Sequence, residues 1–376
     1  MIRIIRRLQN KEYVPLNRVE VSKSALVNNY RYLASCDKRI SIAPVLKSNA
    51  YGHGLIKIAK TLDNLGCPMF CVDSLHEAYE LSKGEIKTPI FIMGYINPPN
   101  LKIKKLNFTY AIYDFRQAEI LNQFQPGSKV HVKVDTGMNR LGVPLNELGK
   151  LITKIKKLKN IEIVGLMSHF SSPKVSKPYT DYQTKNFKEA LKILRQHHIE
   201  PEWRHLAASG GLLNNVNSIS KITNMARVGI SLFGLYRTGK FSKLKPVLKL
   251  TSQIVQLKRI KKGEYIGYDM AYRANSDMKI AVLPIGYNDG VERRLTNKGF
   301  IKVGNKFCRV VGKVSMNITT IDVTDVDVRL GNKVVVYSDK IADVNSLENV
   351  AANVGTIPHE LLVHLNPASI RREIVP

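Results

Sequence analysis

The feature that most constrains the fold is a regular alternation of short apolar runs with longer amphipathic stretches between residues 40 and 234. The runs predict strands at 40–46, 68–74, 88–94, 108–114, 129–135, 162–170, 202–209 and 226–234. Between most of them, as in 55–66 and 186–197, apolar residues recur three and four apart, which is the spacing of one helix face. Eight strand–helix units predict a parallel (β/α)8 barrel, the TIM barrel, whose doubly buried strands are continuously apolar.

A second domain follows the barrel. After about residue 245 the chain changes to alternating runs at 279–287, 300–323 and 332–339, separated by turns such as KKGE, TNKG and LGNK. This pattern predicts a mostly antiparallel β domain. We therefore expect a barrel over 16–240, whose N-terminal strand could join the β domain, and a β domain over 241–376. We expect residues 1–15 to form a basic N-terminal extension.

Composition limits the classes of partner. A chain of 376 residues, 44% of them hydrophobic, is too long for one ordinary core. No apolar run reaches the roughly 18 residues of a membrane span. The start, MIRIIRRLQNKEY, is a poor secretory signal because it has no long apolar core and no small-residue cleavage site, and a short organellar targeting peptide is the alternative to a basic extension there. We therefore expect a soluble, cytoplasmic protein with no membrane partner.

The charge is strongly positive. The net value of +28 comes from 58 Lys and Arg against 30 Asp and Glu and attracts polyanions. The lysines are scattered, however, and no nucleic-acid-binding motif is present, so no specific nucleic-acid partner is expected. The four cysteines have neither redox nor zinc-site spacing, which predicts reduced thiols and no metal.

Polar residues gather where the predicted barrel strands end, which is where such barrels carry their chemistry. Lys47 ends the first run, and Ser168 and His169 end the sixth. A strand-end lysine can form a Schiff base once it loses its proton, and partial burial lowers its pKa from about 10.4. The small residues of ASGG (208–211) and RVGI (227–230) leave backbone N–H groups free for a phosphate. Together these features indicate pyridoxal phosphate, although each alone also fits a surface lysine or a structural turn.

Six motifs carry a family resemblance. They are PVLKSNAYGHG (44–54), VKVDTGMNRLG (132–142), SHF (168–170), RVGISLFG (227–234), PIGYNDG (284–290) and VVGKVSMN (310–317). Their content and order closely resemble those of the alanine racemases over roughly residues 16–376. The resemblance implies a pyridoxal 5'-phosphate-dependent enzyme that interconverts L-alanine and D-alanine and supplies D-alanine for peptidoglycan.

The resemblance also implies roles in catalysis. Lys47 would hold the cofactor and act as one base, and Tyr268 would be the second base, reaching the active site of the other subunit of a homodimer. His169 would link Tyr268 to Arg227, and Arg140 would position the substrate carboxylate.

Further roles concern the cofactor and the entrance. Tyr51, Ser209 and the backbone of Gly229 and Ile230 would bind the phosphate, and Arg227 would face the pyridine nitrogen. Met316 would come from the other subunit, and Tyr287 would gate the substrate entrance. Lys133 matches a lysine that is carbamylated in many members, and we expect it to be carbamylated here.

These roles are physically coherent. Racemisation removes the α-proton on one face and returns one on the other, so it suits two bases with unperturbed pKa values near 10 that are tuned downward. The cations Arg140 and Arg227 favour a tyrosinate. Because a guanidinium only donates, Arg227 leaves the pyridine nitrogen unprotonated, which restricts side reactions.

Several positions depart from the family pattern. Ala208 replaces a common asparagine, Asp269 a glycine, Asn317 an aspartate and His359 a frequent tyrosine. These changes leave broader specificity open, for example toward serine. Three different functions also compete with a racemase: a decarboxylase of the same fold, a non-catalytic cofactor-binding barrel and a basic nucleic-acid-binding module. Arg227 argues against the decarboxylase, the β domain argues against the single barrel, and only net charge supports the nucleic-acid-binding module.

Overall fold

The computed structural model describes residues 14–236 and 243–376. Most of the expected basic extension, residues 1–13, and part of the expected domain boundary, residues 237–242, lie outside the described residues. The chain divides into two compact units. One is Lys23–Val247, and the other joins the residues up to Ser22 to Leu248–Pro376.

The first unit is a closed barrel of parallel strands. Its strands are β2 (Ser41–Pro44), β3 (Phe70–Val72), β4 (Ile90–Ile92), β5 (Thr109–Ile112), β6 (Ser128–Asp135), β8 (Ile161–Met167), β9 (Trp203–His205) and β10 (Met225–Val228). Strands β3, β4, β5, β6, β8 and β9 pair in that order, and β10 pairs with β2, all in parallel. A bridge between Val45 and Cys71 joins β2 to β3, and a bridge between Ala208 and Arg227 joins β9 to β10. The predicted (β/α)8 barrel is confirmed.

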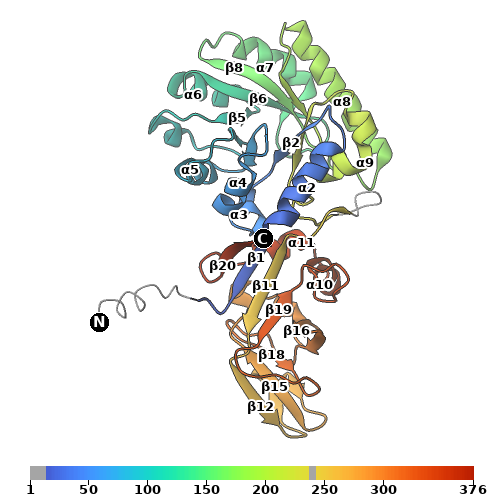
Figure 1. Cartoon of the computed structure of the whole chain (residues 1–376). Coiled ribbons are helices and arrows are strands. Elements are labelled where there is room, and N and C mark those ends of the chain that lie inside the picture. Colours follow the sequence, from blue (N-terminus) through green and yellow to red (C-terminus); the bar gives the residue numbers. More distant parts are fainter. Residues whose placement is uncertain (1–13, 237–242) are drawn as a thin grey trace, which may run out of the picture. The chain divides into compact units, whose positions relative to one another are not determined.

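Helices surround these strands (Figure 1). They are α2 (Lys23–Ser35), α4 (Leu55–Leu62), α5 (Leu75–Lys83), α6 (Phe115–Phe124), α7 (Leu148–Ile155), α8 (Lys177–Gln196) and α9 (Ser209–Ile219). Shorter elements are the turn α3 (Lys47–Tyr51), η1 (Pro98–Lys102), β7 (Val143–Pro144) and η2 (Leu145–Glu147). Helix α7 shows why the helices form: its buried residues Leu148, Leu151, Ile152 and Ile155 share one face. A cluster that includes Val45, Cys71, Phe91 and Met225 forms one part of the core.

The second unit is a β domain. Its larger sheet has the order β17 (Lys306–Arg309), β16 (Phe300–Val303), β19 (Lys333–Tyr337), β11 (Leu248–Gln253), β1 (Arg18–Ser22), β20 (Arg371–Val375). A second sheet contains β12 (Gln256–Ile260), β15 (Met278–Leu283) and β18 (Thr319–Asp322), and β13 (Tyr265–Ile266) pairs with β14 (Tyr272–Arg273). The pairs are antiparallel except β1 with β20, so the unit is mostly antiparallel, as predicted.

The remaining elements of this unit are short. They are η4 (Tyr268–Met270), η5 (Tyr287–Asp289), η6 (Arg293–Leu295), α10 (Leu347–Val354) and α11 (Pro358–Val363). Both η4 and η5 begin at a tyrosine that the family resemblance assigns to the active site.

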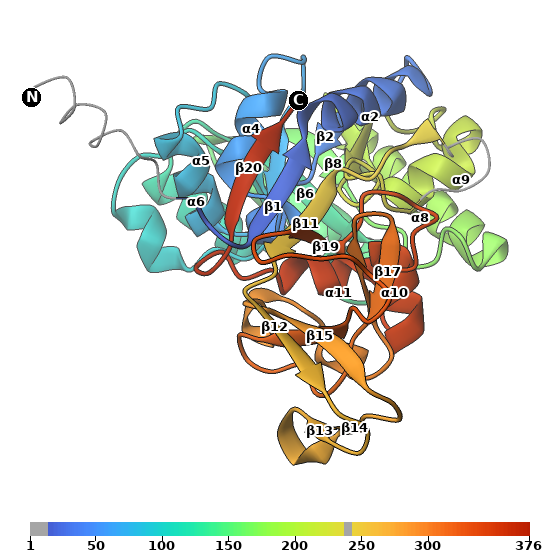
Figure 2. The ribbon, with the colours of Figure 1, turned by 60° about the horizontal axis from the view of Figure 1, so that its bottom comes forward.

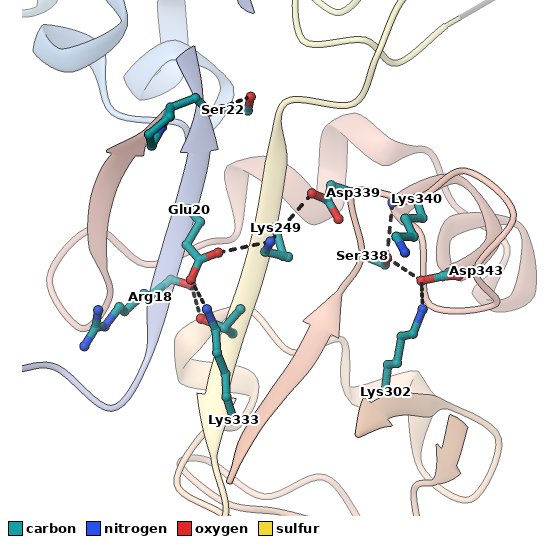
Figure 3. A network of polar contacts seen from close by, with 12 residues as sticks. Arg18, Glu20, Ser22, Lys249, Lys302, Lys333, Ser338, Asp339, Lys340 and Asp343 are labelled. Atoms are coloured by element: carbon teal, nitrogen blue, oxygen red, sulfur yellow. Dashed lines mark hydrogen bonds and ion pairs between the residues drawn. The ribbon is translucent and has the colours of Figure 1, made fainter. Parts of the chain in front are cut away.

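Strand β1 lies between β11 and β20, although it precedes the whole barrel in the sequence (Figure 2). Ion pairs hold it there. The Glu20 carboxylate receives Lys249 Nζ at 3.2 Å and also Lys333 Nζ (Figure 3). Burial raises the pKa of Glu20, but the hydrogen bonds from the two lysines outweigh burial and lower it overall. Glu20 is therefore ionised and ties β1 to β11 and β19.

Candidate active site

The expected site residues fall into two groups, one in each unit. The barrel unit carries Lys47, Tyr51, Lys133, Arg140, His169, Ser209, Arg227, Gly229 and Ile230. The β unit carries Tyr268, Tyr287 and Met316.

Lys47 begins a left-handed turn. Strand β2 ends at Pro44, two residues before the end of the predicted strand 40–46, although Val45 still forms a bridge to Cys71. Ser48, Asn49, Ala50 and Tyr51 all have φ between 52° and 54°. L-residues reach this region at a cost of roughly 1–2 kcal/mol each because Cβ approaches the following carbonyl oxygen. Four such non-glycine residues in a row mark a backbone that its surroundings must hold in place.

The Lys47 side chain is partly exposed at the end of the barrel. Its Nζ lies 3.6 Å from Asp73 Oδ1, just past β3, and 41% of the side chain is accessible.

Lys133 lies on β6 and is only 8% exposed. Burial, aided by the positive charges of Arg227 and Arg140, lowers the pKa of Lys133 to about 8. An appreciable fraction of this amine is therefore neutral near physiological pH.

A close approach of backbone and ring lies beside Tyr51. A Cβ built on Gly229 would fall 2.3 Å from the Tyr51 hydroxyl oxygen, so only glycine fits there. Burial raises the pKa of Tyr51 to about 12, which keeps its hydroxyl a hydrogen-bond donor. Ser209 begins α9, and its Oγ accepts a hydrogen bond from the Ser231 N–H at 3.3 Å.

These residues fit a phosphate group. Within residues 14–236 and 243–376 no acceptor is found for the N–H groups of Gly229 and Ile230. The first amides of α9, which begins at Ser209, lie at the positive end of a helix. Phenol, serine hydroxyl, free amides and a helix N-terminus are the donors that a phosphate ester needs.

Arg227 is the centre of a buried hydrogen-bond network. Its NH1 donates to His205 Nδ1 at 2.5 Å, and its NH2 donates to the Ser168 carbonyl at 2.6 Å and to His169 Nδ1 at 3.1 Å. His205 Nε2 lies 2.7 Å from His131 Nδ1. Burial lowers the pKa of Arg227 to about 10, so the guanidinium is still a cation at neutral pH.

The network fixes the histidine tautomers. Because a guanidinium only donates, His205 Nδ1 and His169 Nδ1 must accept, and each ring carries its proton on Nε2. His205 therefore donates to His131. Burial first, and then the charge of Arg227, lowers the pKa values of His131 and His169 to about 3 and that of His205 well below its usual range. All three imidazoles are neutral at physiological pH.

The sequence motifs did not identify His131 and His205. A usable signal was present: His131 and Lys133 stand two apart on β6, so both project to the same side of the strand. Gly165, on the neighbouring β8, leaves space for the His131 ring, because a Cβ there would lie 2.4 Å from the ring.

Arg140 follows β6 and is exposed, and its charge acts on both Lys133 and His169.

In the β unit, three loops gather the other expected residues. The Tyr287 N–H donates to the Ser315 carbonyl at 3.0 Å, and the Asn288 N–H donates to the Met316 carbonyl at 2.9 Å. The loop of Tyr268 is joined to the same region by an ion pair between Asp269 and Lys313. Tyr268, Met316 and Tyr287 are 70%, 56% and 41% exposed. The β unit thus presents two tyrosines and a methionine together at its surface.

The unusual Asp269 has a structural explanation. It has φ 56°, in the region that favours the glycine of the family pattern. Aspartate tolerates this region better than most residues. Lys313 lowers the pKa of the Asp269 carboxyl by a hydrogen bond, so the charged form is paired.

Two other departures from the family pattern are Ala208 and Asn317. Ala208 is the N-cap of α9 without a side-chain cap, and Asn317 is exposed beside Met316.

Two other kinds of feature are absent from the described residues. No helix in 14–236 or 243–376 is long and apolar enough to cross a membrane. In the same ranges, no group of three or more His, Cys, Asp and Glu side chains could hold a metal ion.

Comparisons with known proteins agree with the motifs. The family model described as "Alanine racemase, N-terminal domain" matches residues 21–237, and "Alanine racemase, C-terminal domain" matches 247–373. The chain is 34% identical over 364 residues to an alanine racemase of Helicobacter pylori (strain G27), covering 93% of this chain and 96% of the relative. It is 34% identical over 374 residues to that of Geobacter sp. (strain M21), covering 94% and 97%.

Solved structures give the same result. The alanine racemase of Bacillus anthracis with bound L-Ala-P has a TM-score of 0.88 and 28% identity, with 97% of this chain and 96% of that chain covered. The enzyme from E. faecalis has a TM-score of 0.86 and 28% identity, with 96% and 98% covered. Both units, the order of the motifs and these similarities lead to one conclusion: the chain belongs to the alanine racemase family, whose members are pyridoxal phosphate-dependent isomerases that interconvert L-alanine and D-alanine.

Proposed function

We propose that this alanine racemase uses two bases, Lys47 and Tyr268, on opposite faces of the substrate. The observation that carries the proposal is the arrangement at the barrel end. Lys47 and Tyr51 follow β2 there, and Arg227, near the end of β10, bonds to His205 at the end of β9 and to His169 just past β8. Pyridoxal phosphate, when bound, withdraws electrons and so acidifies the α-carbon of the amino acid. The chain's residues then bind, orient and move the proton.

The phosphate would be held by Tyr51, Ser209 and the amides of Gly229 and Ile230. Lys47 Nζ would hold the cofactor and exchange the α-proton on one face, and the Tyr268 hydroxyl would exchange it on the other. Arg140 would orient the substrate carboxylate. His169 carries its proton on Nε2 because Nδ1 accepts from Arg227, so it could donate to Tyr268 and stabilise the tyrosinate.

Arg227 would set the electronic character of the cofactor. Three acceptors, His205, His169 and the Ser168 carbonyl, fix the guanidinium. Facing the pyridine nitrogen, Arg227 would donate a hydrogen bond and leave that nitrogen unprotonated. A weaker electron sink limits competing reactions and thus favours racemisation over decarboxylation.

We also propose a homodimer in which Tyr268, Met316 and the entrance residue Tyr287 complete the site of the second copy. The exposure of these three side chains on joined loops of the β unit supports it. An exposed apolar cluster on joined loops is typical of an interaction site. An isologous dimer would give each copy the same two half-sites.

Lys133 is proposed to be carbamylated. Its amine, with a pKa near 8, attacks carbon dioxide, an N–C bond forms, one proton leaves, and a carbamate anion remains. The anion would relieve the repulsion between Lys133 and the two arginines whose charges lower its pKa. Carbon-13 NMR after exposure to labelled bicarbonate tests this, and a bare ammonium in high-resolution density would contradict it.

In the cell, the product D-alanine would enter peptidoglycan synthesis, and the enzyme would work in the cytoplasm. Membership of the alanine racemase family supports this role.

The main experiment follows optical rotation of L-alanine by purified protein with pyridoxal phosphate, together with visible absorption of the lysine-bound cofactor. We expect loss of rotation and a visible band that Lys47→Ala abolishes. Absence of the band after cofactor addition would overturn the proposal. Sedimentation in the same buffer tests the dimer, and a monomer with full activity would contradict the shared site.

A further inference from the structure

We propose that Glu77 is a positioning residue that clamps the left-handed turn 48–51 and thereby holds Lys47 and Tyr51 ready for the cofactor. The inference rests on the proposed function, because it concerns the two residues that would anchor pyridoxal phosphate. Glu77 lies in the first turn of α5, outside the set of residues that the sequence motifs assign to the site.

The first observation is that one carboxylate receives three backbone N–H groups. Glu77 Oε1 accepts from Ser48 at 2.5 Å. Glu77 Oε2 accepts from Asp73 at 2.9 Å and from Ser74 at 3.3 Å. Ser48 follows Lys47, and Asp73 is the residue whose carboxylate lies near Lys47 Nζ. Glu77 therefore joins the segments after β2 and β3 at the point where Lys47 projects.

The second observation separates this role from helix capping. The capping box of α5 uses the Ser74 side chain on the Glu77 N–H and the Glu77 side chain on the Ser74 N–H. It needs one carboxylate oxygen. The bond from Oε1 to Ser48 is no part of the helix cap and acts only on the left-handed turn.

The third observation is that side-chain hydrogen bonds, as well as backbone hydrogen bonds, hold the turn. Asn49 Oδ1 accepts from the Leu55 N–H at 2.8 Å. His53 Nδ1 lies 2.9 Å from the carbonyls of both Ala50 and Tyr51, and its ring stacks on Phe233 with centroids 3.9 Å apart. These contacts fix the later part of the turn. Glu77 fixes its first amide, which lies next to the reactive lysine.

Lys47 and Tyr51 stand at the two ends of this one turn. A shift of the turn would therefore move the amine and the phenol together and separate them from the Gly229 backbone. Strained backbone at a binding site persists only where neighbours over-determine it. Glu77 supplies this constraint before the cofactor arrives, which lowers the ordering cost of binding.

The test compares Glu77→Gln with the matched control Ser74→Ala. A glutamine has one acceptor oxygen, so it can keep the helix cap or the bond to Ser48, but not both. Ser74→Ala removes the capping hydroxyl and leaves Ser48 untouched. The readouts are the Kd of the cofactor-free protein for pyridoxal phosphate, hydrogen exchange at the Ser48 amide, and the melting temperature.

We expect Glu77→Gln to raise the Kd about tenfold and to speed exchange at Ser48, as loss of one charge-assisted hydrogen bond would. Ser74→Ala should change the Kd less than about twofold, although both variants lower the melting temperature. Adding Ser48→Gly to Glu77→Gln should recover part of the affinity, because glycine adopts φ near 54° without strain.

Equal effects of Glu77→Gln and Ser74→Ala on the Kd would overturn the inference, since capping alone would then explain Glu77. A wild-type protein that binds no cofactor would instead overturn the proposed function. The two failures are therefore distinguishable in one series of measurements.

Discussion

The Tyr51 hydroxyl packs against the backbone of Gly229 so closely that a Cβ added there would lie 2.3 Å from the hydroxyl oxygen. The contact joins the segment after β10 to the end of the turn α3, two parts of the chain that are distant in sequence. It places a phenol donor against a backbone that carries no side chain. The proposed phosphate site therefore depends on the absence of a side chain at Gly229 as much as on the Tyr51 hydroxyl.

Gly229→Ala should displace Tyr51 and weaken cofactor binding. Losing a hydrogen bond to a charged phosphate costs about 1.5–3 kcal/mol, which corresponds to roughly a 10- to 100-fold rise in Kd. Absorbance titration with pyridoxal phosphate measures the change. Gly149→Ala, in α7, is the matched control because its Cβ would have only ordinary contacts at 3.6 Å or more. Equal affinity in both variants would exclude the Tyr51 contact from phosphate binding.

Tyr268→Phe should separate proton exchange from racemisation. Because L- and D-alanine are equal in free energy, racemisation must fall equally in both directions, by roughly 10²- to 10⁴-fold for loss of a general acid–base. In deuterium oxide, Lys47 should still exchange the α-proton of one enantiomer, which NMR detects. Tyr268 is 70% exposed, so the stability of the isolated chain should change by less than about 0.5 kcal/mol.

Tyr265→Phe, also exposed and three residues earlier, is the control for Tyr268→Phe and should keep full activity. If Tyr268→Phe exchanges the α-protons of both enantiomers at the wild-type rate, Tyr268 is not a base.

Lys133→Met should stabilise the cofactor-free protein when carbon dioxide is excluded. The pKa of Lys133 is about 8 in the folded chain, against 10.5 for a lysine side chain free in water. The unfolded chain thus binds more protons between these values, and stability rises with pH across that window. Below pH 8 the buried cation costs the folded state about 3 kcal/mol, which methionine removes. Urea unfolding at pH 7 and pH 10 should show the variant's advantage shrinking. Lys129→Met, at an exposed position of β6, should show no such trend.

Acid should destabilise the barrel through its buried histidines. The pKa values of His131 and His169 are about 3 in the folded chain, against 6.5 in the reference state. As pH falls from 6.5 toward 3, the unfolded chain takes up protons that the folded chain refuses, so stability falls by about 1.4 kcal/mol per pH unit for each histidine. His131→Gln should flatten this slope in urea unfolding between pH 4 and 6. The exposed His76→Gln should leave the slope unchanged, and an unchanged slope in His131→Gln would contradict burial as its cause.

The barrel could be predicted because its eight strands are local apolar runs, and each run overlaps one observed strand. The candidate site was harder to predict from the sequence. Lys47 and Arg227 were identifiable from motifs, but the left-handed turn was not, since none of its four residues is glycine and local preference gives no sign of it. His131 and His205 form a pair only across β6 and β9, and their contact depends on the closed ring and on the space above Gly165. The exact place of β1 depends on pairing between Arg18 and Arg371, which no short-range pattern reveals.

That pairing has a consequence for synthesis on the ribosome. β1 leaves the exit tunnel before the other described strands, yet its neighbours β11 and β20 follow more than two hundred and three hundred residues later. The barrel can close while its β-sheet is still a lone strand, since all eight barrel strands precede Val247. The nascent chain must therefore carry an unpaired strand edge through most of translation. The charged side chains of Arg18 and Glu20 keep this unpaired strand hydrated and oppose its aggregation until β11 and β20 have been synthesised.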